Sequence, residues 1–336
     1  MLIAGQLLLF LIVSITLWAI ATSRFGWAFY LELFSHFQIQ YWVMVIGLLI
    51  GAVLLRQKTA MGAGLLCGTL LGAQLFTWYL PSAASLVPFK VSSSSSRALP
   101  KDARILRVLI SNIHYSNAAP PALLSFVQKQ DPDVAILMEV TSPAKGRLNA
   151  LVANFPHRAD PAPHAATVIY SKHPLKSSAL ADFGHQPPGG ITLTRIVLPE
   201  QRSVQLVAAH LSSGTSLQRF FNRNHQLADM SQYVQQQDAE QPILLAGDFN
   251  LTAWSPYYRQ LIHQTGLSSA RKGFGVLPTW PNERSLFGLP KALSKFFAIP
   301  IDQCLFSVQL QATSARTAKV VGSDHKALIV DLVIPF

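Results

Sequence analysis

The chain contains 336 residues, of which 50% are hydrophobic and only 13% are charged, and its formal net charge at pH 7 is +11. This composition is too apolar for an ordinary soluble enzyme. With only two cysteines, Cys67 and Cys304, it also excludes a disulfide framework and a metal site of clustered cysteines.

Three stretches in the first hundred residues are long and apolar enough for membrane-spanning helices, which need about 20 residues each. They cover approximately residues 2–22, 38–55 and 61–80. A cleaved signal peptide is the alternative for the first stretch, but no lysine or arginine precedes Arg24, so the basic start of a signal peptide is missing. We therefore expect residues 1–80 to form a membrane domain with three transmembrane helices.

The loops between these stretches predict an orientation in the membrane. Arg56 and Lys58 lie in the second loop without an acidic residue, whereas Arg24 in the first loop is balanced by Glu32. Because positively charged loops stay in the cytoplasm, three spans place the following residues on the other side. The sequence thus predicts a multi-pass protein of a bacterial inner membrane whose globular domain is periplasmic.

A segment containing prolines and a run of serines, residues 81–103, follows the third stretch. Its composition is typical of a flexible tether. A coil of about 20 residues spans roughly 25 Å, so the globular domain, residues 104–336, is expected to stay close to the membrane.

Apolar, β-branched runs alternate with helix-like stretches in residues 104–336. The strand-like runs are residues 105–110, 134–137, 167–170, 193–198, 204–209, 243–246, 299–306 and 328–334. The helix-like stretches are residues 121–130, 143–154, 217–237 and 256–264. This mixture indicates an α/β or α+β domain.

Polar residues stand where these strands are expected to end. They are Asn112, Glu139, His210, Asp248, Asn250, Asp302, Asp324 and His325. Each one alone is more often a cap or a solvated side chain, but chance does not readily explain the whole series. Strand ends hold side chains firmly and leave them accessible. Carboxylates gathered in this way suit a hard cation and a phosphate.

In order and spacing, these motifs resemble the endonuclease/exonuclease/phosphatase superfamily, which includes pancreatic deoxyribonuclease, apurinic endonucleases, neutral sphingomyelinases and inositol polyphosphate 5-phosphatases. The motifs are residues 107–112 (RVLISN), 131–139 (DPDVAILME), 171–175 (SKHPL), 210–211 (HL), 247–250 (GDFN) and 322–325 (GSDH). The resemblance covers about residues 104–335. Residues 254–259 and 277–281 are most similar to bacterial membrane-tethered members.

The resemblance implies a four-layer sandwich of two packed β-sheets flanked by helices, with the active site at one end and Mg²⁺ or Mn²⁺ as the cofactor. The implied metal ligands are Asn112, Glu139, Asp248, Asn250 and Asp324. The implied catalytic residues are His210, Asp248, Asn250, Asp302, Asp324 and His325. In this scheme Asp302 orients His325, and either His325 or Asp248 accepts a proton. Gln303 departs from the family, which more often has histidine or tyrosine after this aspartate.

The expected reaction is hydrolysis of a phosphodiester or a phosphomonoester by in-line attack of water. The substrate is expected to be lipid-linked or a nucleic acid. The basic region 271–295 suits contact with nucleic acid or with anionic lipid, although it can also be a solvated loop. Arg219 and Arg223 lie four residues apart on a predicted helix and could contact phosphate, but a solvated helix face is favoured. Apart from the substrate and the lipid bilayer, no protein partner is implied. The alternative is a non-catalytic, membrane-anchored scaffold that keeps the fold for binding.

Overall fold

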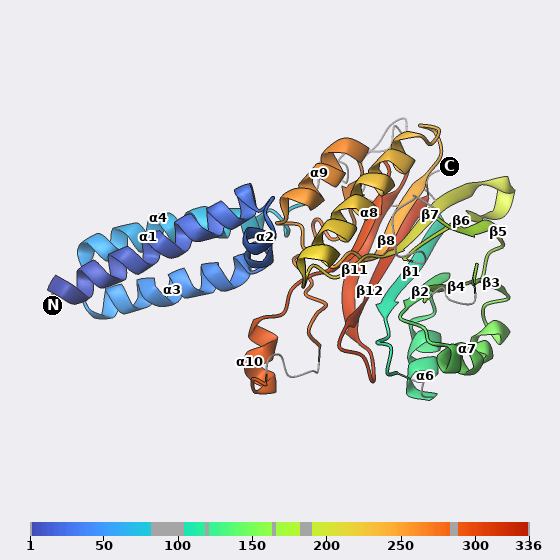
Figure 1. The fold of residues 1–336 in the computed structure, drawn as a ribbon, viewed down its shortest axis with the longest axis horizontal. Coiled ribbons are helices and arrows are strands. Elements are labelled where there is room, and N and C mark those ends of the chain that lie inside the picture. Colours follow the sequence, from blue (N-terminus) through green and yellow to red (C-terminus); the bar gives the residue numbers. More distant parts are fainter. Residues whose placement is uncertain are drawn as a thin grey trace, which may run out of the picture.

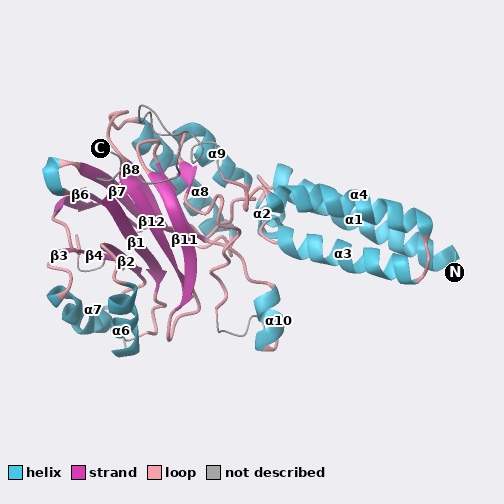
Figure 2. Ribbon diagram, turned by 180° about the vertical axis from the view of Figure 1, so that it is seen from behind, coloured by secondary structure: helices cyan, strands magenta, loops and turns pink. Residues whose placement is uncertain are grey.

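A computed structural model describes residues 2–81, 104–117, 121–162, 166–181, 190–282 and 288–334. An elongated helical bundle at the N-terminus adjoins a larger α/β part, and the two meet near α2 (Figures 1 and 2). The predicted tether, residues 81–103, lies outside the described residues except for Pro81.

The bundle consists of three long helices and one short helix. They are α1 (Leu2–Phe25), α2 (Phe29–Ser35), α3 (Gln38–Leu54) and α4 (Lys58–Phe76). Two stretches, Ile3–Phe25 and Lys58–Phe76, are long and apolar enough to cross a membrane. The pair α2–α3, bent by 65°, provides a third candidate if it is counted as one span. Taken alone, α3 has 17 residues and a length of about 25 Å, less than the ~30 Å of a bilayer core.

The outer surface of the bundle is apolar. Ile3, Phe10, Leu17, Leu54 and Leu66 are all more than half exposed. Exposed apolar surface of this extent is typical of contact with lipid or with another protein. The bundle therefore has the surface expected of membrane-spanning helices.

Two six-stranded sheets form the centre of the α/β part. The first has the strand order β11-β12-β1-β2-β4-β3, and the second has the order β5-β6-β7-β8-β10-β9. The strands of the first sheet are β1 (Arg104–Asn112), β2 (Val134–Met138), β3 (His157–Ala159), β4 (Val168–Ser171), β11 (Gln311–Lys319) and β12 (Lys326–Ile334). The strands of the second sheet are β5 (Leu175–Leu180), β6 (Ile191–Val197), β7 (Ser203–His210), β8 (Ile243–Asp248), β9 (Ser268–Ser269) and β10 (Asp302–Phe306).

Both faces of these sheets are covered, which explains why the central strands are apolar throughout. In β2, Val134, Ile136 and Met138 belong to the core between the sheets. Ala135 and Leu137 point the other way, into the core beneath the outer helices. The strand period of two thus distributes one apolar run between two cores.

Helices complete the outer layers. Those that pack on the first sheet are α6 (Pro121–Gln130) and α7 (Ser142–Leu148), and those on the second are α8 (Leu217–Gln235) and α9 (Pro256–Thr265). The four-layer sandwich expected from the resemblance is confirmed. A further short helix, α10 (Lys291–Phe296), lies between α9 and β10.

The bundle contacts the α/β part directly, which a flexible tether alone did not predict. The Phe29 ring lies edge-on to the Phe220 ring, 5.7 Å between centroids, and Tyr257 Oη donates a hydrogen bond of 2.7 Å to the carbonyl of Trp27. His36 Nδ1 lies 3.1 Å from the hydroxyl of Thr252. These contacts fix α2 against α8 and α9.

A buried ion pair lies at the centre of this contact. Arg223 Nη2 is 2.9 Å from Glu32 Oε2, and both side chains are fully buried. The expectation that Arg223 belongs to a solvated helix face is therefore wrong. No pattern around Arg223 indicates this pair, because the partner carboxylate lies in another part of the chain and resembles a simple loop charge.

Candidate active site

Five of the predicted site residues lie at the ends of neighbouring strands. Asn112 ends β1 and Glu139 follows directly after the parallel strand β2. In the second sheet, the pairing of β7 with β8 puts His210 opposite Asp248, and the pairing of β8 with β10 puts Asp248 opposite Asp302. Both sheets therefore deliver polar side chains to the same edge of the sandwich.

Gly247 permits the close approach of β7 and β8 just before Asp248. Its φ is +148°, and a Cβ at this position would lie 1.8 Å from the carbonyl oxygen of Ala209. Only glycine fits such a position without moving the backbone. The GDFN motif thus has a steric reason for its glycine.

The amide of Asn112 joins two carboxylates. Its Nδ2 donates to Glu139 Oε1 at 2.8 Å and to Asp248 Oδ2 at 3.1 Å. The other Glu139 oxygen accepts from the backbone N–H of Tyr115 at 2.8 Å. His210 Nε2 lies 3.6 Å from Glu139 Oε1. Two acids therefore accept from a single amide group, and an imidazole lies beside one of these acids.

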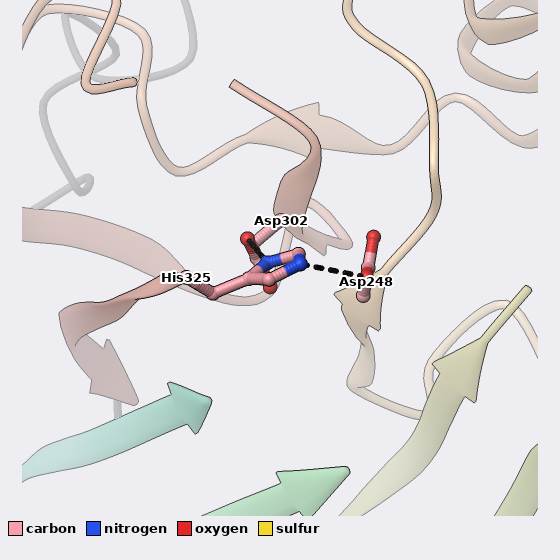
Figure 3. A group of neighbouring side chains, drawn as sticks. All are labelled: Asp248, Asp302 and His325. Carbon is pink, nitrogen blue, oxygen red and sulfur yellow. Dashed lines mark hydrogen bonds and ion pairs between the residues drawn. The ribbon is translucent and has the colours of Figure 1, made fainter. Parts of the chain in front are cut away.

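A second cluster places an imidazole between two carboxylates (Figure 3). His325 Nδ1 is 2.9 Å from Asp302 Oδ2, and its Nε2 is 3.7 Å from Asp248 Oδ2. Burial alone would lower the pKa of His325, but the Asp302 and Asp248 carboxylates outweigh it and raise the pKa to about 10. Burial, helped by the Asp302 charge, raises the pKa of Asp248 to about 6 against the opposing effect of His325.

Ser323 holds this cluster against the first sheet. Its hydroxyl donates to the carbonyl of Asn112 at 2.6 Å and accepts from the backbone N–H of His325 at 2.9 Å. Although Ser323 belongs to the GSDH motif, the sequence assigned it no role. Asp324 is held nearby, because Trp280 Nε1 donates to its Oδ2 at 3.3 Å.

Asn250 has a strained backbone beside Asp248. Its φ is +53°, in the left-handed region that asparagine tolerates better than most residues. Its N–H donates to Asp248 Oδ1 at 2.9 Å, and its side-chain amide donates to the carbonyl of Leu211 at 2.8 Å. Arg223 Nη1 donates to the carbonyl of Asn250 at 3.0 Å. The ion pair beneath α2 is therefore connected to the loop that directly follows Asp248.

Gln303 supports the loop before Asp302 rather than the imidazole. Its side-chain nitrogen donates to the carbonyls of Leu251 and Pro300 at 3.1 and 2.9 Å. Its oxygen accepts from Arg271 Nη1 at 3.3 Å. A glutamine at this position therefore leaves the contact between Asp302 and His325 intact.

A cavity of about 1050 Å³ opens over these residues. Seven of the eight predicted site residues line it, and Asp302 lies behind His325. Sequence reasoning missed the opposite wall, to which Leu33, Phe34 and Phe37 contribute. No motif marks these residues, because they lie in the predicted loop between two apolar stretches.

The model of the Endonuclease/Exonuclease/phosphatase family matches residues 109–325. The chain belongs to this family. No curated protein matches the chain.

Three solved structures illustrate the shared fold. Sphingomyelinase C from Streptomyces griseocarneus is 14% identical, with a TM-score of 0.51 over 68% of this chain and 99% of the other. TDP2 from D. rerio, complexed with a single-strand DNA product, is 14% identical, with a TM-score of 0.55 over 68% and 98%. A beta toxin variant from Staphylococcus aureus with bound magnesium ions is 15% identical, with a TM-score of 0.50 over 68% and 99%.

Two groups of side chains in this Endonuclease/Exonuclease/phosphatase domain could hold a divalent cation. Ligand atoms of Asp248, Asp302 and His325 all lie within 4.8 Å of one another. Asp302 and His325, however, already bond to each other, and an imidazole flanked by two acids is held as a cation. Glu139 and Asp248 instead supply hard oxygen donors around the Asn112 amide, the donor type that Mg²⁺ prefers. The residues present therefore fit Mg²⁺ best on the Glu139 side.

Proposed function

We propose that this protein is a membrane-tethered phosphoesterase that uses Mg²⁺ or Mn²⁺ to hydrolyse a phosphodiester or phosphomonoester. Membership of the Endonuclease/Exonuclease/phosphatase family supports phosphoester hydrolysis in general. The observation that carries the proposal is the pair of clusters that share Asp248. Glu139 and Asp248 flank Asn112 on one side, and His325 is held between Asp248 and Asp302 on the other.

Each cluster has a role in the proposed reaction. Glu139, with Asn112 and Asp248 nearby, would hold a divalent cation, which when bound would supply positive charge to offset the charge of the phosphoryl oxygens. His325 faces a carboxylate at each ring nitrogen, so it is held as an imidazolium. Its Nδ1 bonds to Asp302, whereas its Nε2 lies 3.7 Å from Asp248, too far for a hydrogen bond, and is therefore the nitrogen that donates to the phosphate. Asp248 then becomes the acceptor that orients the attacking water, with Asn250 beside it.

The remaining predicted residues act around this centre. Asp302 fixes the orientation of the His325 ring through their 2.9 Å contact. His210, on the Glu139 side, provides a second imidazole toward the phosphate. Asp324 completes the acidic rim of the cavity, where it helps to hold metal or water.

We further propose that residues 1–80 anchor the enzyme in a bacterial inner membrane, and that residues 81–103 connect this anchor to a periplasmic catalytic domain, residues 104–336. The two or three helices that could cross a membrane support this arrangement. An alkaline phosphatase fusion at the C-terminus is expected to be active in cells. Activity of a cytoplasmic reporter at the same position would contradict the periplasmic orientation.

A substrate panel tests the proposed activity. The full-length protein in detergent should hydrolyse at least one of a phosphomonoester, bis(4-nitrophenyl) phosphate, a long-chain phospholipid, and single- or double-stranded DNA when Mg²⁺ or Mn²⁺ is present. The neighbours include a lipid enzyme and a protein with a DNA product, so both classes belong in the panel. Failure on every substrate with either metal would refute the proposal and leave a binding scaffold.

A further inference from the structure

The cavity over the candidate active site has two walls of opposite polarity. One wall carries the acids, amides and imidazoles described above. The other is apolar and consists mainly of Leu33, Phe34, Phe37, Leu289, Phe297 and Ile299. A cavity with one polar and one apolar wall suits an amphiphilic ligand, which has one polar and one apolar part.

The apolar wall comes from the part of the molecule nearest the membrane helices. Leu33 and Phe34 lie in α2, and Phe37 lies at the start of α3, the helix with which α2 forms a bent pair. The Phe37 ring meets the Phe297 ring edge-on, with 6.1 Å between their centroids. Figures 1 and 2 show α2 and α10 at the end of the bundle that faces the sandwich. The cavity therefore lies where the spans meet the catalytic part, and its apolar wall continues the apolar surface of the bundle.

The charge of the cavity lining favours a lipid over a nucleic acid as the substrate. Among the described residues that line the cavity, Arg219 is the only lysine or arginine. It is exposed, and its Nη1 donates to the hydroxyl of Ser213 at 3.2 Å. A groove for nucleic acid carries several cations that follow the phosphate backbone. One arginine and one metal site instead match a single phosphate group.

We propose that the cavity binds a membrane phospholipid, with its phosphoester at the Glu139–Asp248–His325 end and an acyl chain between α2 and residues 289–299. The part of this inference that concerns turnover rests on the proposed function. The volume of about 1050 Å³ lies just above the range of roughly 300–1,000 Å³ for sites that enclose small molecules, so it accommodates a headgroup and the first part of a chain. The rest of the chain would stay in the bilayer.

Photocrosslinking tests binding without requiring turnover. The full-length protein in nanodiscs would be labelled with phosphatidic acid that carries a diazirine in its acyl chain, in the presence of EDTA. Label should appear on Ile299 or Ile301, which are buried in the cavity wall and only 6% exposed. The amount of label on these two residues should fall at least fivefold in Leu33→Gln. Leu31→Gln, on the same helix but outside the cavity lining, is the matched control and should label as the wild type does.

Labelling confined to the outer surface of the bundle would overturn the inference. Loss of cavity label on addition of a 20-nucleotide single-stranded DNA would overturn it in favour of a nucleic acid.

The turnover test compares two substrates in the same protein. The ratio of phospholipid hydrolysis to bis(4-nitrophenyl) phosphate hydrolysis should fall at least tenfold in Leu33→Gln and in Phe297→Gln, and it should be unchanged in Leu31→Gln. An unchanged ratio in the two cavity variants would refute the lipid site while leaving the phosphoesterase intact. Absence of all hydrolysis would instead refute the proposed function, and the crosslinking result would still decide whether lipid occupies the cavity.

Discussion

The buried ion pair between α2 and α8 should hold the helical bundle against the α/β part. Glu32→Gln keeps the shape of the side chain but removes its charge. Arg223 then keeps hydrogen bonds to the carbonyl of Asn250 and to Asn224 Oδ1, but it loses its counter-charge at 2.9 Å. Because neither side chain contacts solvent, water cannot replace the lost charge.

The structure sets the size of this effect. Two unit charges 2.9 Å apart attract by about 6 kcal/mol at an effective dielectric constant of ~20. A glutamine hydrogen bond recovers part of this energy, so Glu32→Gln should lower the free energy of unfolding by about 3 kcal/mol, within the ~3–5 kcal/mol typical of breaking a buried pair. The double variant Glu32→Gln/Arg223→Met should be about 2 kcal/mol more stable than the sum of the destabilisations of the two single variants predicts.

The assay is urea unfolding of the full-length protein in detergent, followed by tryptophan fluorescence. Glu200→Gln is the control, because Glu200 pairs with Arg202 at the surface, where its side chain is 58% exposed. Glu200→Gln should lower the free energy of unfolding by less than about 0.5 kcal/mol. If Glu32→Gln were no more destabilising than this control, the ion pair would not hold the two parts together.

Three further predictions concern the site. Below pH 6.5 the full stabilising contribution of the protonated His325 to the metal-free fold should be present. Because its folded pKa of about 10 lies above the unfolded value, this contribution, at most about 5 kcal/mol, should be lost as the pH rises toward 10. Urea titrations from pH 6 to 10 should show this loss in the wild type but not in His325→Gln. Asp302→Asn should lower kcat by at least about tenfold with little change in KM, because it releases the His325 ring; equal activity in the two proteins would contradict this role. Gly247→Ala should destabilise the fold by about 3 kcal/mol or more, because the new Cβ would clash with the carbonyl of Ala209. The control Gly146→Ala in α7 has open space around its Cβ and should stabilise the fold slightly. Equal effects of the two variants in urea unfolding would contradict the steric argument.

Much of the sandwich could be predicted from the sequence because its strands are buried on both faces. Such strands appear as continuous apolar runs, and each run that leads into the site ends at a polar residue, as at Asn112 and Asp248. Strand ends lie at the edge of a sheet, so residues far apart in the chain could be assigned to one site before their distances were known. The grouping of the predicted residues around one cavity follows from this regularity.

The other wall of the cavity could not be predicted because it depends on contacts between the two parts of the chain. Glu32 resembled a loop charge and Arg223 a solvated helix residue, since periodicity carries no information about a distant partner. The aromatic and aliphatic residues of α2 have the same apolar character as the long helices on either side of it. Only their position against residues 289–299 reveals their place in the cavity.

The most direct measurement is the metal dependence of turnover on the best substrate of the panel, in the wild type and in Glu139→Gln. The wild type should lose activity in EDTA and regain it with Mg²⁺ or Mn²⁺. Glu139→Gln should be slower by about 10²-fold or more, because it removes a charged oxygen that holds the cation. Glu240→Gln, which changes an exposed acid outside the cavity, should match the wild type. Activity that persists in EDTA, or a Glu139→Gln rate within twofold of the wild type, would contradict a metal-assisted phosphoesterase.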